Sequence, residues 1–418
     1  MEPFKFVHAA DLHLGSPFAG VTAREPEIAQ VLKDASIAAF RNLVDCVIEQ
    51  DARFLLVAGD VFDLDAPSLK ARLAFAEGMK RLSERGIPVF AVYGNHDPVA
   101  SGFKSVALPE NVHVFDSKKV ESILVEVSGR TIALVSGISY AKREETRNLA
   151  AMFPVHESPL FSIGLVHANV GGVGGYENYA ACSISDLAQC GVRYFALGHV
   201  HERRKVCDSP LALYPGNIQG RSFRETGPRG ALVVTVDHAG GAVEVFAPLD
   251  TVRFSERALD IAPFESIGGL LDAMIRQVRE MAAEADGRGL VCRLRLTGRG
   301  SLYGELAAAM AVEDLLSGLK EEFSGLSPFV WVEEIISRVL PDVDLDERRG
   351  GGDLFAQVLA ISDEWRGEGF LSTKKVLADL YSNTRARDAL PALTDKEIEE
   401  LAEGAVLLCL DRLEGEAQ

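Results

Sequence analysis

The stretch Phe54-Leu55-Leu56-Val57-Ala58-Gly59-Asp60 decides the fold. Five apolar residues in a row, ended by a glycine and an aspartate, are typical of a short strand that is buried on both faces. Apolar residues at three- and four-residue spacing precede it in Ile28–Glu49 and follow it in Ser68–Arg85, which predicts a helix on each side. This alternation favours a sheet packed between helices, with Asp60 at the carboxyl end of its strand.

The same rhythm continues over the first 250 residues. From Leu211 to Pro248 the pattern becomes hairpin-like, with Gly240-Gly241 as the turn. The sequence therefore predicts a layered α/β domain over residues 1–253. The other buried strands are expected at Phe4–Ala9, Pro88–Val92, Thr131–Ser136, Phe161–Val166 and Tyr194–Leu197.

A smaller α+β domain is expected over residues 254–341, where strand-like and helix-like segments alternate as βαβαβ. Residues 342–418 are expected to form a helical C-terminal region that could dock onto a partner. Gly350–Gly352 would be a flexible joint, and Thr394 and Glu397 form a capping box before an amphipathic helix. The segments of the smaller domain are strand Arg257–Ile261, helix Ile267–Glu284, strand Leu290–Thr297, helix Leu302–Phe323 and strand Phe329–Ile335.

The composition is that of a soluble globular protein, with 418 residues, 47% of them hydrophobic and 25% charged. No apolar run approaches the roughly 20 residues of a membrane span, and no export signal is recognisable. Six cysteines without a CxxC pair disfavour disulfides and thiolate metal sites, so a reducing cytoplasm is expected. The net charge is −5 over residues 1–250 and −13 over residues 251–418, which together give −18. A nucleic-acid site would therefore need a local basic surface or the charge of bound metal.

Five short motifs follow the predicted strands. In an open α/β sheet the carboxyl ends of strands border the ligand crevice, so side chains far apart in sequence can meet there. The glycines before Asp60, Asn95 and His199 are expected to allow tight turns. The motifs are Asp11-Leu12-His13, Gly59-Asp60, Gly94-Asn95-His96-Asp97, His167 and Gly198-His199-Val200-His201.

These residues have the chemistry of a metal centre. Oxygen and imidazole ligands without thiolates suit Mn, Fe, Zn or a similar divalent ion. Seven ligands exceed one tetrahedral site and suit two ions that share a carboxylate, an arrangement that cleaves phosphoesters. The seven expected ligands are Asp11, His13, Asp60, Asn95, His167, His199 and His201.

His96 remains as a catalytic residue that would stabilise the transition state or protonate the leaving oxygen, and Asp97 is expected to orient it. A lone histidine is more often a packed or surface residue than a ligand. The remaining histidines, His8, His113, His156 and His238, are interpreted in that way.

Together the motifs resemble the calcineurin-like metallophosphoesterases. The segments His8–Gly15, Gly59–Asp63 and Gly94–Pro98 are similar to those of SbcD-type DNA repair exonucleases. Tyr214–Arg221 and Glu225–Gly230 are closer to the bacterial YhaO branch. The resemblance covers about residues 4–250 and implies a layered metallophosphoesterase sandwich with a capping domain.

The resemblance also implies roles for single residues. One metal would be held by Asp11, His13, Asp60 and His201, and the other by Asp60, Asn95, His167 and His199. His96 would be catalytic, the metal Mn and the substrate DNA, with Fe, Zn or Mg as other possible ions. The chain would form a homodimer and work with an SMC-like coiled-coil ATPase.

One position departs from part of the family. Asp63 stands where archaeal and eukaryotic relatives carry a histidine linked to exonuclease action, although bacterial SbcD-type sequences also have aspartate there. The departure leaves the choice between exonuclease and endonuclease open.

Weaker signals surround the motifs. Arg203 and Arg204 follow the last motif, and Arg221 and Arg224 lie nearby, so all four are candidates for phosphate contacts. The glycine-rich segment Gly171–Gly175 lacks the lysine of a P-loop and is expected to form a loop at the rim of the site. Tyr176 or Tyr179 could stack there on a base, or could simply pack.

The leading hypothesis is a two-metal DNA nuclease in a repair complex. One alternative is a phosphodiesterase or phosphatase acting on small nucleotide esters. Another is a catalytically silent DNA-binding scaffold, which the presence of all eight motif residues disfavours.

Overall fold

The structure is a computed structural model that describes residues 2–16, 26–63, 68–101, 108–127, 129–155, 159–308, 310–342, 349–350, 352–365, 370, 375 and 394–416. The chain forms two compact units. The first unit comprises Met1–Ser255 and Ala285–Val291, and the second comprises Glu256–Glu284 and Cys292–Gln418.

Two six-stranded sheets form the centre of the first unit in the part of the chain that the structure describes. In the first sheet β1–β4 run parallel and β11 and β12 add antiparallel strands; in the second, β6, β7, β8 and β10 run parallel. The first sheet has the order β12 (Ala242–Pro248), β11 (Gly230–Val236), β1 (Phe4–Ala9), β2 (Leu55–Ala58), β3 (Val89–Val92), β4 (Val112–Val114). The second sheet has the order β5 (Glu121–Val127), β6 (Arg130–Ile138), β7 (Phe161–His167), β8 (Tyr194–Gly198), β10 (Leu211–Tyr214), β9 (Arg204–Asp208).

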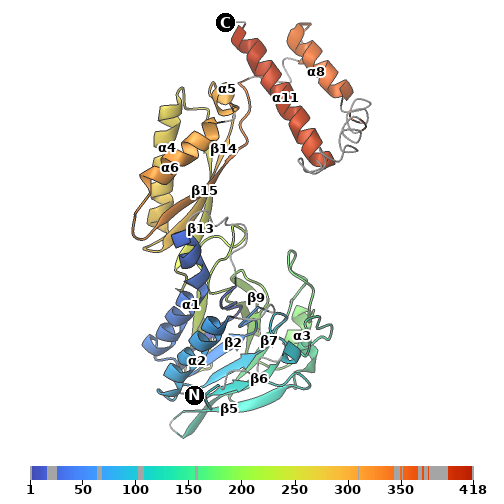
Figure 1. The fold of residues 1–418 in the computed structure, drawn as a ribbon. Coiled ribbons are helices and arrows are strands. Elements are labelled where there is room, and N and C mark those ends of the chain that lie inside the picture. The colour runs from blue at the N-terminus through green and yellow to red at the C-terminus, as the bar shows by residue number, and fades with distance from the viewer. Residues whose placement is uncertain are drawn as a thin grey trace. The chain divides into compact units, whose positions relative to one another are not determined.

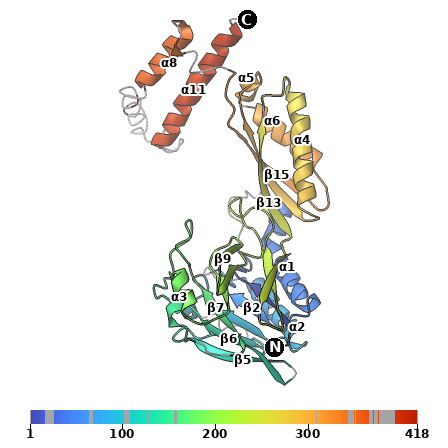
Figure 2. The ribbon, with the colours of Figure 1, turned by 180° about the vertical axis from the view of Figure 1, so that it is seen from behind.

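Helices cover the outer faces of both sheets, which gives a helix–sheet–sheet–helix arrangement. Helices α1 (Pro26–Glu49) and α2 (Leu69–Ser83) lie on one side, and α3 (Ile184–Ala188) lies on the other (Figures 1 and 2). Aromatic residues fill the space between the sheets, where the rings of Phe6 and Phe54 stack at 5.0 Å. The predicted layered α/β fold is confirmed.

The predicted strands and helices of the first unit are confirmed to within a few residues. The strands β4, β5 and β9 and the short helix α3 were not predicted. Strand β4 has three residues and β9 is mostly exposed, so neither carries a run of buried residues. Edge strands of this kind give a weak sequence signal because few of their side chains face a core.

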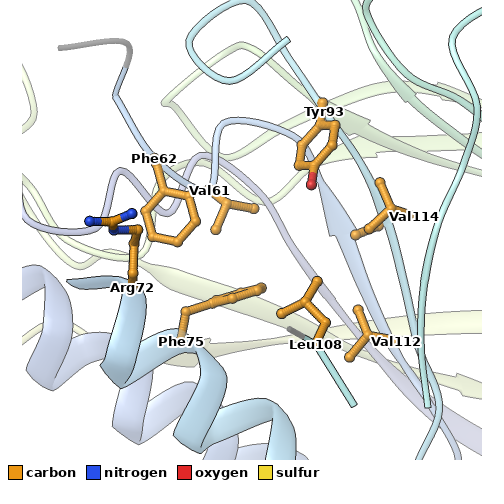
Figure 3. A pocket seen from close by; sticks show the side chains of 9 residues that line it. Val61, Phe62, Arg72, Phe75, Tyr93, Leu108, Val112 and Val114 are labelled. Atoms are coloured by element: carbon orange, nitrogen blue, oxygen red, sulfur yellow. The ribbon is translucent and has the colours of Figure 1, made fainter. Parts of the chain in front are cut away.

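A small cavity of about 30 Å³ lies between α2 and the strands β3 and β4 (Figure 3). Apolar side chains dominate its lining, among them Phe62, Phe75 and Leu108. Phe62 comes from the loop that begins at Asp60, so this part of the core supports the carboxyl end of β2.

A third sheet consists of β13 (Val252–Asp260), β14 (Gly289–Thr297) and β15 (Val330–Ser337). The second unit holds β15, the helices α4 (Ile267–Glu284) and α6 (Ala311–Glu322), and the C-terminal parts of β13 and β14, whose first residues belong to the first unit. The prediction of one helix over Leu302–Phe323 is wrong. The chain forms α5 (Tyr303–Leu306) and then α6, and Leu302 and Met310 before these helices provide no side-chain cap. Both parts still bury apolar residues, which explains the continuous helical pattern of the sequence.

Two further helices, α8 (Leu354–Glu364) and α11 (Asp395–Glu416), pack together through Phe355, Leu359 and Leu410. The capping box is confirmed, because Thr394 Oγ1 accepts from the Glu397 N–H and the Thr394 N–H donates to Glu397 at 2.7 Å. Residue 351 of the predicted joint and His156 lie outside the described residues. Among the described helices none is long and apolar enough to cross a membrane.

Candidate metal centre

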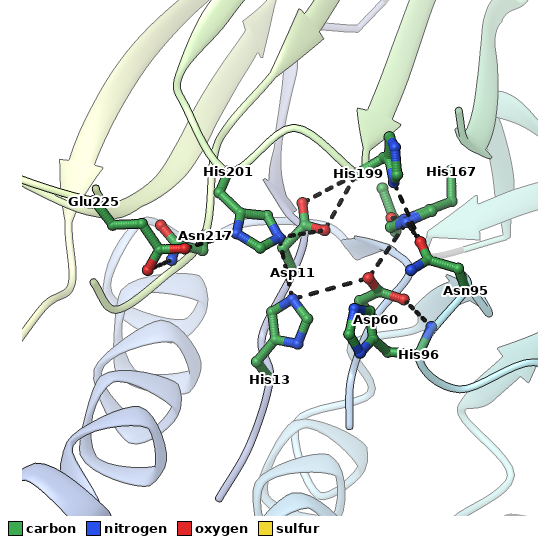
Figure 4. A network of polar contacts seen from close by, with 12 residues as sticks. Asp11, His13, Asp60, Asn95, His96, His167, His199, His201, Asn217 and Glu225 are labelled. Carbon is green, nitrogen blue, oxygen red and sulfur yellow. Dashed lines mark hydrogen bonds and ion pairs between the residues drawn. The ribbon is translucent and has the colours of Figure 1, made fainter. Parts of the chain in front are cut away.

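The seven expected metal ligands lie together at the carboxyl ends of β1, β2, β3, β7 and β8 (Figure 4). Asp60, after β2, lies at the middle of the cluster. Its Oδ2 is 3.8 Å from His13 Nε2 and 3.4 Å from His167 Nε2, while Oδ1 accepts the His96 N–H at 2.9 Å. One carboxylate oxygen therefore faces histidines on both sides, as a bridging ligand must.

Two groups of donors flank Asp60. On one side, His201 Nε2 lies 3.2 Å from His13 Nε2 and 3.8 Å from Asp11 Oδ1. On the other side, Asn95 Oδ1 lies 3.0 Å from His167 Nε2 and 3.2 Å from His199 Nδ1. The family resemblance implies these two groups as ligand sets, and metal binding by them stays a prediction.

The backbone of the cluster is unusual. Asp11, His13, Asp60 and His199 all have positive φ, between 42° and 103°, a region that residues other than glycine seldom adopt. Such strain is typical of functional sites, where the surrounding structure holds it in place.

The glycines of the motifs mainly allow neighbouring segments to approach closely, and only one of them is needed for a tight turn. Only Gly59 has a positive φ among the three glycines before Asp60, Asn95 and His199. A Cβ on Gly94 would overlap Asp60 Oδ1, and one on Gly198 would overlap the Ala58 carbonyl oxygen. The expectation of tight turns therefore holds for Gly59 alone, and the other two glycines allow ligand-bearing segments to touch.

The donor set fits divalent cations. The Nδ1 atoms of His13 and His201 lie 2.7 Å from the carboxylates of Asp63 and Glu225, so each Nδ1 carries the proton and each Nε2 presents a lone pair. Two lone pairs facing each other at 3.2 Å repel, unless a positive charge lies between them. Burial strengthens this demand, because Asp11, His13, Asp60 and His167 are each at most 1% exposed.

His96 is more open than the ligands, with about a third of its side chain exposed. Its Nδ1 lies 2.9 Å from Asp63 Oδ1. Burial opposes the charged imidazole, but the hydrogen bond to Asp63 and the negative charges of Asp60 and Asp63 together raise the pKa of His96 above its usual value.

The prediction that Asp97 orients His96 is wrong. Asp97 is fully buried, and its oxygens accept the N–H groups of Val61 at 2.7 Å and of Gly94 at 2.8 Å. It therefore ties the loop after β2 to the loop after β3. The carboxylate beside the His96 ring belongs to Asp63.

The segment Gly171–Tyr179, here called the glycine loop, borders the cluster. Its Glu177 carbonyl accepts from His199 Nε2 at 2.6 Å, and the Tyr176 ring lies 5.7 Å from that of His201. The buried Asn169 holds the loop through bonds to Val173 and Glu177. The loop is thus placed at the rim as predicted, while base stacking by Tyr176 or Tyr179 stays a prediction.

Four arginines are expected to contact phosphate. Among the contacts described for them, those of Arg221 reach the cluster. Its guanidinium lies 3.3 Å from Glu225 and 3.8 Å from Asp63. Arg203 instead lies over the ring of Phe246 at 4.6 Å, and Arg204 and Arg224 are exposed. Phosphate contact stays a prediction for all four.

Glu225 and Asp63 are the residues whose roles the sequence did not reveal. Asp63 was noticed for its place in the second motif, and Glu225 as part of the segment resembling the YhaO branch. A carboxylate that becomes buried must find a hydrogen-bond or ion-pair partner. An acidic residue within one of these family-like segments was therefore a signal that it could contact a residue of the centre.

Comparison with known proteins places this site in a family. The family described as calcineurin-like phosphoesterase matches residues 4–203, and the one described as metallophosphoesterase YhaO, middle domain, matches residues 254–339. The uncharacterized metallophosphoesterase YhaO of Bacillus subtilis is 32% identical over 329 residues, which are 78% of this chain and 79% of that protein.

Archaeal proteins named DNA double-strand break repair protein Mre11 are also similar. The one from Sulfurisphaera tokodaii is 28% identical over 233 residues, or 53% of this chain and 57% of the relative. The one from Archaeoglobus fulgidus is 25% identical over 244 residues, or 53% and 51%. The chain thus spans little more than half the length of these two relatives. It belongs to the YhaO family of calcineurin-like metallophosphoesterases, and so to the metal-dependent phosphoester hydrolases.

Proposed function

We propose that this protein is a manganese-dependent DNA nuclease with two metal positions. The observation that carries the proposal is the position of Asp60, whose Oδ2 faces one donor group through His13 and the other through His167. Asp11, His13, Asp60 and His201 would hold one ion, and Asp60, Asn95, His167 and His199 the other. When bound, the ions supply hydroxide at neutral pH and neutralise phosphate charge.

His96 would act on the leaving oxygen. A group that donates a proton must be charged at the working pH, and the contact with Asp63 favours the charged imidazole. Its partial exposure lets it reach a bound substrate, while Asp63 fixes its ring. Arg221 would contact a phosphate beside the metals.

DNA as the substrate is supported by the names of the Mre11 relatives and by the second unit. We propose that residues 1–253 carry the catalysis, that residues 254–341 form a capping domain that contacts DNA, and that residues 342–418 dock a partner. The reducing cytoplasm remains the proposed location, in keeping with six free cysteines.

Two surfaces support the proposed assembly. Leu69 and Leu73 of α2 are more than half exposed, and Val31 of α1 is 44% exposed, which favours a homodimer through these helices.

The groove between α8 and α11 exposes Ile361 and Leu401 and would take an apolar helix of a coiled-coil ATPase. Light scattering tests both: L69E/L73E should give a monomer, and Leu401→Asp should abolish the complex with the ATPase.

A gel assay on end-labelled linear and hairpin DNA tests the nuclease. Mn²⁺-dependent cleavage should stop with chelator and fall at least a hundredfold in His96→Ala. His113→Ala is the matched control, because His113 pairs with Glu121 away from the cluster.

Hydrolysis of bis-p-nitrophenyl phosphate without DNA cleavage would favour the alternative of a small-ester phosphodiesterase. Metal binding and DNA binding with no hydrolysis of either substrate would leave the silent scaffold.

A further inference from the structure

The four histidines of the centre are held by two kinds of acceptor. His13 and His201 each donate from Nδ1 to a carboxylate, Asp63 Oδ1 and Glu225 Oε1, at 2.7 Å. The other two donate to main-chain carbonyls: His167 Nδ1 to Ala58 at 2.9 Å, and His199 Nε2 to Glu177 at 2.6 Å. The division follows the two donor groups, because both carboxylate-held histidines stand on the Asp11 side.

Glu225 is itself firmly placed. Its Oε2 accepts from the Arg221 N–H at 2.8 Å and from Asn217 Nδ2 at 3.0 Å, and its side chain is 12% exposed. The Arg221 guanidinium also approaches His201 Nδ1 at 3.3 Å, but two donors cannot share one proton position. The shorter contact with Glu225 decides that Nδ1 carries the proton, so Nε2 is the atom left for a metal.

Asp63 has the matching place on His13. It also accepts from the Ser16 hydroxyl, and the Arg221 guanidinium lies 3.8 Å from its Oδ2. Arg221 thus stands between the two carboxylates that hold His13 and His201. The ring nitrogens that His167 and His199 turn away from the centre contact neutral main-chain carbonyls among the described residues. The Asp11 carboxylate approaches this side through the main chain, where it accepts the His199 N–H at 3.1 Å.

The two acceptor types differ in what they do to a ligand. A carboxylate accepts a stronger hydrogen bond than a carbonyl and leaves the imidazole more electron-rich, so the opposite nitrogen binds a cation better. The proposed ligand sets add to the difference: the set of His13 and His201 includes the Asp11 carboxylate, whereas the set of His167 and His199 includes the neutral amide of Asn95.

We infer that the two metal positions are unequal, and that the position formed by Asp11, His13, Asp60 and His201 binds its divalent ion more tightly. Glu225 and Asp63 are the positioning residues that create the difference. The inference rests on the proposed two-metal centre but not on DNA as the substrate.

Titration of metal-free full-length protein with Mn²⁺, followed by calorimetry and by the spin-resonance signal of free Mn²⁺, tests it. Two classes of site are expected. Glu225→Gln keeps the shape of the side chain but removes its charge, and it should weaken the tighter class by about 10- to 100-fold while leaving the weaker class unchanged. Asn95→Ala should remove the weaker class and retain the tighter one.

Glu202→Gln is the matched control, because it removes an exposed carboxylate next in sequence to His201, and both classes should stay as in the parent protein. Urea unfolding in chelator shows whether each variant is folded. If Glu225→Gln does not fold, Asp63→Asn makes the same test on His13. The inference would be overturned if both sites bind Mn²⁺ with equal affinity, or if the folded variant weakens Mn²⁺ binding equally at both sites.

This outcome is separable from the fate of the nuclease proposal. Two unequal Mn²⁺ classes in a protein that cleaves no DNA keep the inference and remove the nuclease. DNA cleavage by a protein whose two sites bind Mn²⁺ equally would keep the nuclease proposal and remove the inference.

Discussion

Asp63 joins two tasks in one side chain. Its Oδ1 lies 2.7 Å from Nδ1 of the expected ligand His13 and 2.9 Å from Nδ1 of His96. Burial disfavours its charge, but the two histidines and Arg221 hold the pKa of this carboxyl far below its usual range. It is therefore an anion at every pH at which the enzyme would work.

Asp63→Asn should move the alkaline limb of the pH–rate profile to lower pH. Asp63 raises the pKa of His96, so the parent protein keeps His96 protonated to a higher pH than the variant can. The measurement is kcat for bis-p-nitrophenyl phosphate between pH 6 and 9 at saturating Mn²⁺, which compensates for weaker metal binding. An unchanged limb with a uniformly lower kcat would mean that Asp63 serves His13 alone.

His8 shows the opposite electrostatic behaviour. It joins the two sheets through Tyr194 Oη at 2.9 Å and the Leu197 carbonyl at 3.2 Å. Burial, only partly opposed by the carbonyl, lowers the pKa of His8 to about 3. The unfolded chain takes up a proton near pH 6.5 and the folded protein does not, so the contribution is complete above pH 6.5 and is lost as the pH falls towards 3.

His8→Gln should therefore cost less stability at pH 5 than at pH 7. The gap in unfolding free energy between parent and variant should narrow by up to about 2 kcal/mol, from roughly 1.4 kcal/mol per pH unit. Urea unfolding in chelator at both pH values measures it. A constant gap for His8→Gln would contradict the assignment.

At the scale of elements, α2 connects the outer layer to the metal-bearing loop. Phe75 packs at 5.4 Å from the ring of Phe40 in α1 and at 5.6 Å from that of Phe62, just after Asp60 and Val61. The small cavity of Figure 3 lies against the rings of Phe62 and Phe75. The helix therefore supports the loop by packing.

Phe75→Ala should destabilise the protein by about 3–5 kcal/mol, because the new space joins an existing void and cannot be filled by a small shift. Urea unfolding measures the loss. Lys80→Ala, at an exposed position of the same helix, should change stability by less than about 0.5 kcal/mol. A loss for Phe75→Ala no larger than that of the control would mean that the loop is held by Asp97 alone.

The sequence could predict whatever follows directly from a buried strand. Asp11, Asp60 and His167 each come within two residues of such a strand, so their meeting needed only the parallel arrangement. The partners of the histidines could not be predicted in this way. Asp63 reaches His13 across 50 positions and Glu225 reaches His201 across 24, through loops without periodicity. The break between α5 and α6 escaped for a related reason, because the apolar spacing continues through it.

For the whole molecule, a net charge of −18 must be reconciled with the polyanionic substrate that we propose. Long-range repulsion then makes binding depend on short-range contacts, from Arg221 and the bound ions. Such contacts release counterions, so their number appears in the salt dependence.

Raising the salt from 50 to 200 mM should weaken DNA binding by the Mn²⁺-loaded protein by about tenfold or more, as expected for two or more phosphate contacts. Arg221→Gln should flatten the slope of log affinity against log salt by about one. Fluorescence anisotropy with a His96→Ala background measures both without cleavage. A slope that Arg221→Gln leaves intact would remove Arg221 from the phosphate contacts.

The closeness of Gly198 to the Ala58 carbonyl has one more consequence. These residues end strands of different sheets, and His167 Nδ1 donates to that same carbonyl. The direct contact between these two main-chain segments therefore fixes the distance between the two sheets at the centre. Substitutions of core side chains can therefore leave the distance between these two strand ends unchanged. A single methyl group at position 198 would instead push the strand ends apart.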